Sequence, residues 1–168
     1  KFVFIGDTDS INIEIIVKSH KLVKNKIKYI IIADIEEFIR YSSKLYSNLK
    51  INKILDPISF SNYDKESLNI FDIQNVGKKK CSNLINQINF SNYLSCKSKI
   101  DLITMPINKS LFKKNINFVG MTEYLGHLNN KKTTMLMHGK KFSVIPLTTH
   151  INLKNVNFSI NKNFLYKN

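Results

Sequence analysis

Side chains that could bind an anion or a metal ion occur in four short segments, each directly after an apolar stretch. These segments are Gly6–Ser10, Thr104–Lys109, Gly120–Glu123 and Thr148–His150. In open α/β sheets, ligands bind beyond the carboxyl ends of the strands, so the residues that follow a strand are the first candidates for a site. The four segments are therefore the candidate site-forming parts of this sequence.

The first three segments carry groups suited to an anionic ligand. Gly6 and Asp7 precede a predicted helix, where they favour either a tight turn with an N-cap or an anion-binding helix start. Lys109 could hold a phosphate, but in a chain with 25 lysines a solvated side chain is the favoured interpretation. Thr122 begins a predicted helix, so its hydroxyl and the free backbone N–H groups could face an anion, with a plain N-cap as the alternative.

The fourth segment contains the histidine best placed to bind a ligand. His150 ends an apolar stretch after two threonines, whereas the other histidines are His20, His127 and His138. A zinc site needs three or four ligands, and no HxxxH or CxxC spacing supplies such a cluster here. A structural role is therefore the alternative to ligand binding for His150.

Short apolar strands alternate with amphipathic helices, a pattern that predicts an α/β fold with a largely parallel sheet. Asp34 is placed to cap the helix that follows it. Ile11, Ile15 and Leu22 lie near one face of the predicted first helix, with Ile16 and Val23 beside them. The predicted strands span residues 1–6, 28–33, 51–55, 68–73, 100–105, 133–137 and 141–147, and the predicted helices span 10–24, 80–98, 110–114 and 122–128 in addition to the Asp34 helix. We expect one unit over residues 1–168 without an internal boundary.

The net charge of +14 could indicate nucleic-acid binding, but the kind of basic residue argues against it. Of 26 basic residues only Arg40 is an arginine, the residue that proteins favour for bidentate contacts to bases. The lysine excess resembles mutational drift in an AT-rich genome. We interpret the run Lys78–Lys80 as a solvated loop, and expect no specific nucleic-acid partner.

Several features indicate a cytoplasmic protein with a packed core. With 43% hydrophobic residues in 168, the chain can bury a core. Its apolar runs are much shorter than the roughly 20 residues needed to span a bilayer, and its opening is too short for a signal peptide. Cys81 and Cys96 would lie roughly 22 Å apart on one helix, beyond disulfide reach. They are therefore predicted to be free thiols in a reducing compartment.

Taken together, the candidate segments resemble the 4-hydroxythreonine-4-phosphate dehydrogenase family of vitamin B6 biosynthesis. That family carries, in this order, a D-x-x-(V/I)-T-x-P-(I/V)-(N/H)-K stretch, a G-H-T-E stretch and a T-T-H-x-P-L stretch. The matching parts of this chain are Asp101–Lys109, Phe118–Leu125 and Thr148–Val156. Gly6-Asp7 with Glu14-Ile15 is similar to the family's G-D-P-x-G-I-G-P-E-I start.

This resemblance implies an α/β/α sandwich like that of the isocitrate and isopropylmalate dehydrogenases, of which the chain would be the N-terminal half. It also implies NAD-dependent oxidation of 4-phosphooxy-L-threonine to 2-amino-3-oxo-4-phosphooxybutanoate, which loses carbon dioxide to give 3-amino-2-oxopropyl phosphate. A divalent metal (Zn, Mg or Co) held by three histidines would act as a Lewis acid. By motif match, His150 would be one metal ligand and Thr122 would bind the substrate, with Lys109 and Asp7 as further candidates. The family forms homodimers that share a metal ligand between subunits.

The chain also departs from the family pattern. Met121 stands where the family has a substrate-binding histidine, and a thioether cannot donate a hydrogen bond. Ser10-Ile11-Asn12-Ile13 replaces G-I-G-P, and the chain has about half the family's length. Catalytic and cofactor-binding residues are therefore not assigned. The alternatives to a dehydrogenase are a truncated, non-catalytic relict acting as a dimerising or binding module, and a basic nucleic-acid-binding domain.

Overall fold

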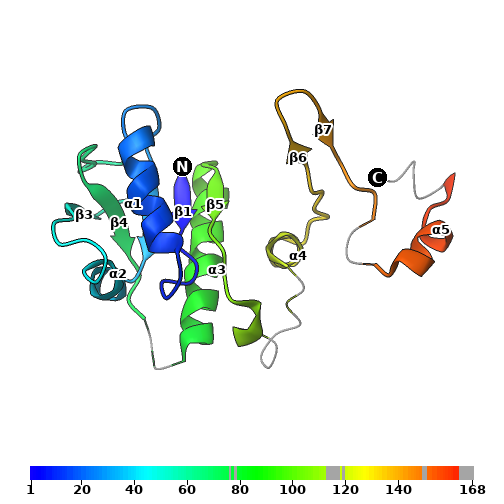
Figure 1. Ribbon diagram of the computed structural model, residues 1–168, viewed down its shortest axis with the longest axis horizontal. Coiled ribbons are helices and arrows are strands. Elements are labelled where there is room, and N and C mark those ends of the chain that lie inside the picture. Colours follow the sequence, from blue (N-terminus) through cyan, green and yellow to red (C-terminus); the bar gives the residue numbers. More distant parts are fainter. Residues whose placement is uncertain (76, 78, 113–117, 119, 149–150, 163–168) are drawn as a thin grey trace. The chain divides into compact units, whose positions relative to one another are not determined.

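The computed structural model describes residues 1–75, 77, 79–112, 118, 120–148 and 151–162. The chain divides into two compact units, Lys1–Val119 and Gly120–Asn168. The first unit contains a five-stranded sheet with helices, and the second contains short helices and a two-stranded hairpin (Figure 1). Whether residues 1–168 form one unit depends on how these two units associate. The expected organisation as one unit therefore stays a prediction.

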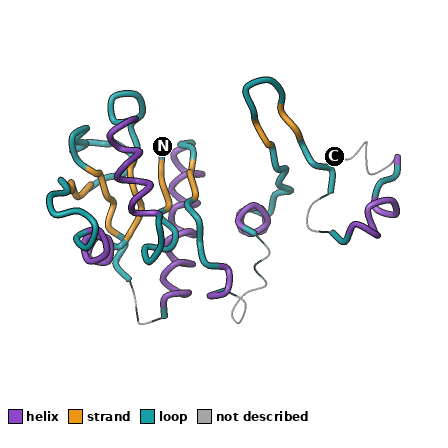
Figure 2. The backbone as a smooth tube through the Cα atoms, viewed as in Figure 1, coloured by secondary structure: helices purple, strands orange, loops and turns teal. Residues whose placement is uncertain are grey.

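The sheet of the first unit is entirely parallel, with the strand order β3-β4-β2-β1-β5. Figure 2 shows the strands in orange and the helices in purple. Its strands are β1 (Phe2–Phe4), β2 (Ile30–Ala33), β3 (Ile51–Ile54), β4 (Leu68–Asp72) and β5 (Leu102–Thr104). The connecting helices are α1 (Asn12–Val23), α2 (Ile35–Ser42) and α3 (Lys80–Ser98). The predicted α/β class and parallel sheet are confirmed.

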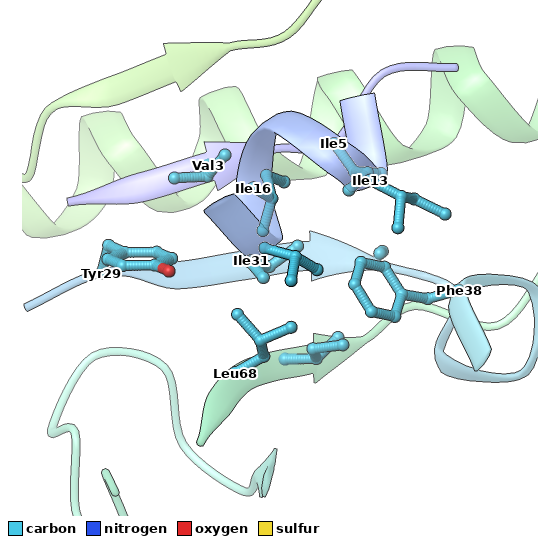
Figure 3. Packing of buried hydrophobic residues seen from close by; sticks show 11 residues of the cluster. Val3, Ile5, Ile13, Ile16, Tyr29, Ile31, Phe38 and Leu68 are labelled. Atoms are coloured by element: carbon cyan, nitrogen blue, oxygen red, sulfur yellow. The ribbon is translucent and has the colours of Figure 1, made fainter. Parts of the chain in front are cut away.

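Both faces of the sheet are covered, because successive strand residues point to opposite sides. On one face, Val3, Ile5 and Ile31 pack against Ile13 and Ile16 of α1 and Phe38 of α2 (Figure 3). On the other face, Phe2, Ile30 and Ile32 form a cluster with Leu94 of α3. The first unit is therefore an α/β/α sandwich, as predicted.

The predicted apolar face of α1 is only partly confirmed, because Ile16 is buried but Ile11, Ile15 and Leu22 are exposed. Ile11 and Leu22 are 65% and 74% exposed, whereas Ile13 and Ile16 are almost completely buried. The buried residues of this helix begin at Asn12, whose amide is hydrogen-bonded beneath the loop after β1. That polar anchor sets the rotation of the helix, which the apolar spacing alone did not reveal.

Two other local predictions are confirmed. The Asp34 side chain accepts a hydrogen bond of 2.8 Å from the Glu37 backbone N–H and caps α2. Helix α3 spans the predicted residues, and its cysteines are free, Cys81 buried and Cys96 exposed. None of the helices in the described part of the chain is both long and apolar enough to cross a bilayer.

The second unit differs more from its prediction. It contains α4 (Met121–Leu128), η2 (Leu153–Asn155), α5 (Val156–Ser159) and an antiparallel pair of two-residue strands, β6 (Met137–His138) and β7 (Ser143–Val144). The predicted strands 133–137 and 141–147 are therefore mostly wrong. Most of their apolar residues lie at the surface. The prediction from hydrophobicity therefore made both strands too long.

We expect the stability of the first unit to fall as the pH drops below about 6.5, because of His20. Its Nδ1 lies 2.8 Å from the Tyr29 hydroxyl, and burial, followed by the charge of Lys24, lowers the pKa of His20. A lowered folded-state pKa means that the unfolded chain binds the proton first. Stability is therefore full above the unfolded pKa and decreases until the pH reaches the folded pKa. Urea unfolding between pH 7.5 and pH 5.5 should show this slope, and His20→Gln should remove it. Equal slopes in both proteins would contradict the assignment.

Candidate functional site

The loop after β1 is folded by its own side chains. Gly6 has a φ of +69°, a conformation that favours glycine. The Asp7 carboxylate accepts a hydrogen bond of 3.1 Å from the Asp9 backbone N–H, and the Ser10 hydroxyl donates to the Asp7 carbonyl. The loop is therefore a compact polar turn at the carboxyl end of the central part of the sheet.

Asp7 does not cap the following helix, contrary to the N-cap interpretation. The N-cap of α1 is Ile11, without a side-chain hydrogen bond. Instead, Asp7 is buried and its Oδ1 lies 2.6 Å from the Lys80 ammonium. Although burial opposes it, the hydrogen bond and charge of Asp7 raise the pKa of Lys80. The interpretation of Lys80 as a solvated loop residue was therefore wrong, while Lys79 is exposed and Lys78 lies outside the described residues.

Asn12 joins the loops that follow β1 and β5. Its Nδ2 donates to the carbonyls of Ile5, Asp7 and Pro106 at 2.9, 3.2 and 2.8 Å. The Pro106 carbonyl also accepts from the Asp7 backbone N–H. Sequence reasoning noted Asn12 only as a departure from a motif and missed this role. A single polar residue at the start of an apolar helix was the available signal.

Lys109 lies in the segment that follows β5 in the first unit. It begins a short 3-10 helix, η1 (Lys109–Leu111), rather than preceding a helix over 110–114. The Asn108 side chain caps this turn by accepting from the Ser110 N–H and hydroxyl. Lys109 itself is exposed.

Met121 and Thr122 are the first two residues of α4 in the second unit. The N-cap is Gly120, with extended backbone and no side-chain cap. The first-turn N–H groups of a helix have no intrahelical partner, so this end of α4 attracts negative charge. The prediction that Thr122 lies at a helix start is confirmed, and both side chains are half-buried. Binding of a substrate there stays a prediction.

The predicted metal ligand His150 lies outside the described residues. Within residues 1–75, 79–112 and the other described ranges, no group of three or more His, Cys, Asp or Glu side chains could hold a metal ion. His20 pairs with Tyr29, and His138 lies 2.8 Å from the Ser143 hydroxyl. The described residues therefore do not by themselves form a metal centre.

A hydrogen-bonded network that sequence reasoning missed lies at the carboxyl edge of the sheet. Thr8 and the Asn75 amide donate to the two carboxylate oxygens of Glu37, each at 2.8 Å. The Gln87 amide donates to Asn75 at 3.0 Å. The network links the β1 loop, α2, the segment after β4 and α3. Its members are far apart in sequence, and no local pattern marked them.

A family model and two curated relatives match this chain over most of its length. A family model described as pyridoxal phosphate biosynthetic protein PdxA matches residues 13–168. A 4-hydroxythreonine-4-phosphate dehydrogenase of Campylobacter fetus is 32% identical over 160 residues, covering 93% of this chain and 49% of the relative. A Fusobacterium nucleatum protein, named as a proposed D-threonate 4-phosphate dehydrogenase, is 29% identical, covering 94% and 52%. The chain spans about half the length of these curated relatives.

Solved structures of similar fold carry the first of these names. The 4-hydroxythreonine-4-phosphate dehydrogenase of Klebsiella pneumoniae has a TM-score of 0.82 at 21% identity, covering 98% of this chain and 55% of that structure. The enzyme of Burkholderia phymatum has a TM-score of 0.80 at 22% identity, covering 99% and 54%. At these identities the likeness shows the fold alone.

Proposed function

Because the chain belongs to the PdxA family of pyridoxal phosphate biosynthetic proteins, we propose that it supplies half of an NAD-dependent dehydrogenase acting on 4-phosphooxy-L-threonine. The family match over residues 13–168 is the observation that carries this proposal. The product would be 2-amino-3-oxo-4-phosphooxybutanoate, which loses carbon dioxide to give 3-amino-2-oxopropyl phosphate. D-threonate 4-phosphate is the second candidate substrate, because relatives carry both names. The two substrates differ at C2, where one has an amino group and the other a hydroxyl.

In this proposal the start of α4 holds the anionic substrate. Thr122 offers a hydroxyl, and the first-turn N–H groups add the positive end of the helix dipole. By motif match, Lys109 and Asp7 are further candidate substrate-binding residues. The chain would act as a cytoplasmic homodimer on a small phosphorylated compound.

A divalent metal ion (Zn, Mg or Co) would stabilise the alkoxide from which hydride leaves, and we assign His150 as one of its ligands. The described residues provide no three-ligand cluster. We therefore attribute no step of the reaction to a metal ion held by the described residues.

We expect the 168-residue chain alone to form no NADH above background from either substrate with NAD and zinc or magnesium. A single imidazole cannot hold a divalent ion in the geometry that Lewis-acid catalysis requires. A chimera that joins this chain to the remaining half of the Campylobacter fetus relative should oxidise one of the two substrates, followed by absorbance of NADH. Turnover by the 168-residue chain alone would refute the requirement for further residues. A folded chimera inactive on both substrates would refute the proposed function.

Met121→His in the same chimera should tighten substrate binding by about tenfold or more. The change adds a donor to a charged ligand, worth about 1.5–3 kcal/mol. Titration calorimetry with 4-phosphooxy-L-threonine measures the difference. Met137→His is the matched control, because Met137 is 59% exposed on β6, away from the start of α4 in sequence. Equal affinities of the Met121→His and parent proteins would place the substrate elsewhere.

A further inference from the structure

A polar pocket of about 370 Å³ lies at the carboxyl edge of the sheet in the first unit. Its walls come from four segments: the β1 loop, α2, the residues after β4 and the first turns of α3. The lining residues are Thr8, Glu37, Arg40, Tyr41, Asn75, Gly77, Lys80, Asn83, Leu84 and Gln87. This is the edge at which ligands bind in open α/β sheets, and the volume suits a small molecule.

The Glu37 and Asn75 acceptors of this pocket already have partners, whereas the buried Asn83 Oδ1 accepts no hydrogen bond from the described residues. Both Glu37 carboxylate oxygens accept hydrogen bonds, from Thr8 and from Asn75. The Asn75 carbonyl oxygen accepts from Gln87. Although Glu37 brings a negative charge, that charge is therefore held within the network that forms the wall.

The cationic donors, in contrast, retain capacity for a ligand. The Arg40 guanidinium has five N–H groups and lies over the Tyr41 ring, 5.2 Å from its centroid. Lys80 gives one short hydrogen bond to Asp7 and lies 4.0 Å from Asp9. Its remaining N–H groups are available on a side chain that is 35% exposed. A ligand that matches the pocket must therefore be rich in acceptors and negatively charged.

Arg40 is suited to one kind of anion. It is the only arginine among 26 basic residues, and its planar fork can donate two parallel hydrogen bonds, which a lysine cannot. The Tyr41 ring supports the guanidinium, and Lys44 approaches the same ring at 4.9 Å. Lys80 also begins α3, whose first turn contains no acidic residue, so the helix dipole adds to the positive potential.

We propose that this pocket binds the phosphate group of a small metabolite through Arg40 and Lys80. A phosphate offers enough oxygens for both the Arg40 fork and the Lys80 ammonium. The phosphate ester of a phosphorylated hydroxy acid and the diphosphate of a dinucleotide share this chemistry. The pocket is lined by residues of the first unit alone, and its occupancy requires no turnover.

A second basic hollow provides an internal comparison. Lys24, Lys26, Lys28 and Lys65 line a space of about 510 Å³ beside Tyr63. Lys24 pairs with Glu66, and Lys28 lies over the Tyr63 ring. These are flexible point charges without an arginine fork. Non-specific attraction of anions by the +14 chain would favour this hollow over the Arg40 pocket.

Titration of the 168-residue chain with inorganic phosphate, followed by amide NMR near physiological ionic strength, tests the proposal. We expect shifts at Arg40, Lys80, Asn83 and Gln87. Arg40→Gln should weaken binding by about tenfold, and Arg40→Lys should weaken it less. Lys21→Gln removes one charge at an exposed site on α1 and should change the affinity by less than about twofold. Shifts confined to Lys24–Lys28 and Lys65, or equal weakening by Lys21→Gln and Arg40→Gln, would overturn the assignment.

Two further titrations identify the source of the phosphate. NAD and 4-phosphooxy-L-threonine are each added to the parent chain and to Arg40→Gln. A loss of affinity for one of them identifies the phosphate that the pocket takes. Affinities for both that are independent of Arg40 would overturn the proposal. These titrations measure binding and not activity. Their outcome therefore does not depend on whether the dehydrogenase chimera is active. Arg40 is exposed, so its variants should melt at the temperature of the parent, which circular dichroism checks.

Discussion

Gly6→Ala is expected to lower the free energy of unfolding of the chain by about 2–5 kcal/mol. The φ of +69° at this position disfavours any residue with a Cβ. An added Cβ would also lie 2.4 Å from the Pro106 carbonyl oxygen and 2.9 Å from that of Met105. Both contacts are backbone atoms of the segment that follows β5. Relief of the clash would therefore separate the β1 loop from that segment.

Gly77→Ala is the matched control for this effect, measured by urea unfolding. Gly77 also has a positive φ, +109°, but an added Cβ would meet no atom within 4 Å. Its variant should therefore show the backbone strain alone, about 1–2 kcal/mol. Similar losses in the two variants would mean that the close approach of the β1 loop to Pro106 does not contribute to stability.

Asn12→Asp is expected to destabilise the chain by about 3–5 kcal/mol at pH 7. Asn12 is completely buried, and its Nδ2 donates to three carbonyl oxygens. A carboxylate oxygen in the place of Nδ2 would face those carbonyls with a negative charge and no hydrogen to donate. The size of the side chain hardly changes, so the effect measures the three hydrogen bonds and the charge rather than packing.

The pH dependence of Asn12→Asp gives this test a second readout. Burial against three carbonyls raises the folded-state pKa of the new carboxyl above its unfolded value of about 3.9. The folded variant therefore gains a proton before the unfolded one, so its deficit relative to the parent shrinks as the pH falls through the raised pKa. Asn25→Asp makes the same chemical change at an exposed position and should leave stability within about 0.5 kcal/mol. A deficit that does not change with pH would contradict the proposed geometry at Asn12.

Both variants probe the same structural feature, the junction between the loops after β1 and β5. The two strands are neighbours in the sheet, with Phe4 paired to Thr104. Gly6 permits the two backbones to approach, and Asn12 links them by a hydrogen bond to the Pro106 carbonyl. The loops that carry Asp7 and Lys109 depend on this junction for their positions.

The sequence by itself determined the features that are encoded locally. Short apolar runs and helical spacing located the strands and helices of the first unit, and Asp34 was identified as a cap because capping needs only residues within one turn. The motif segments from Asp101 to Val156 led to the family to which the chain belongs. Thr122 was placed at a helix start for the same local reason.

Only the tertiary structure decided which partners these elements bring together. The pairing of Asp7 with Lys80, the three acceptors of Asn12 and the Arg40 pocket each join segments that are distant in sequence. Ile11 and Ile13 are equally apolar, yet one is exposed and the other buried, because the anchor at Asn12 fixes the rotation of α1. Residue type and spacing describe what a segment can do, whereas burial and hydrogen-bond partners depend on the surfaces that pack against it.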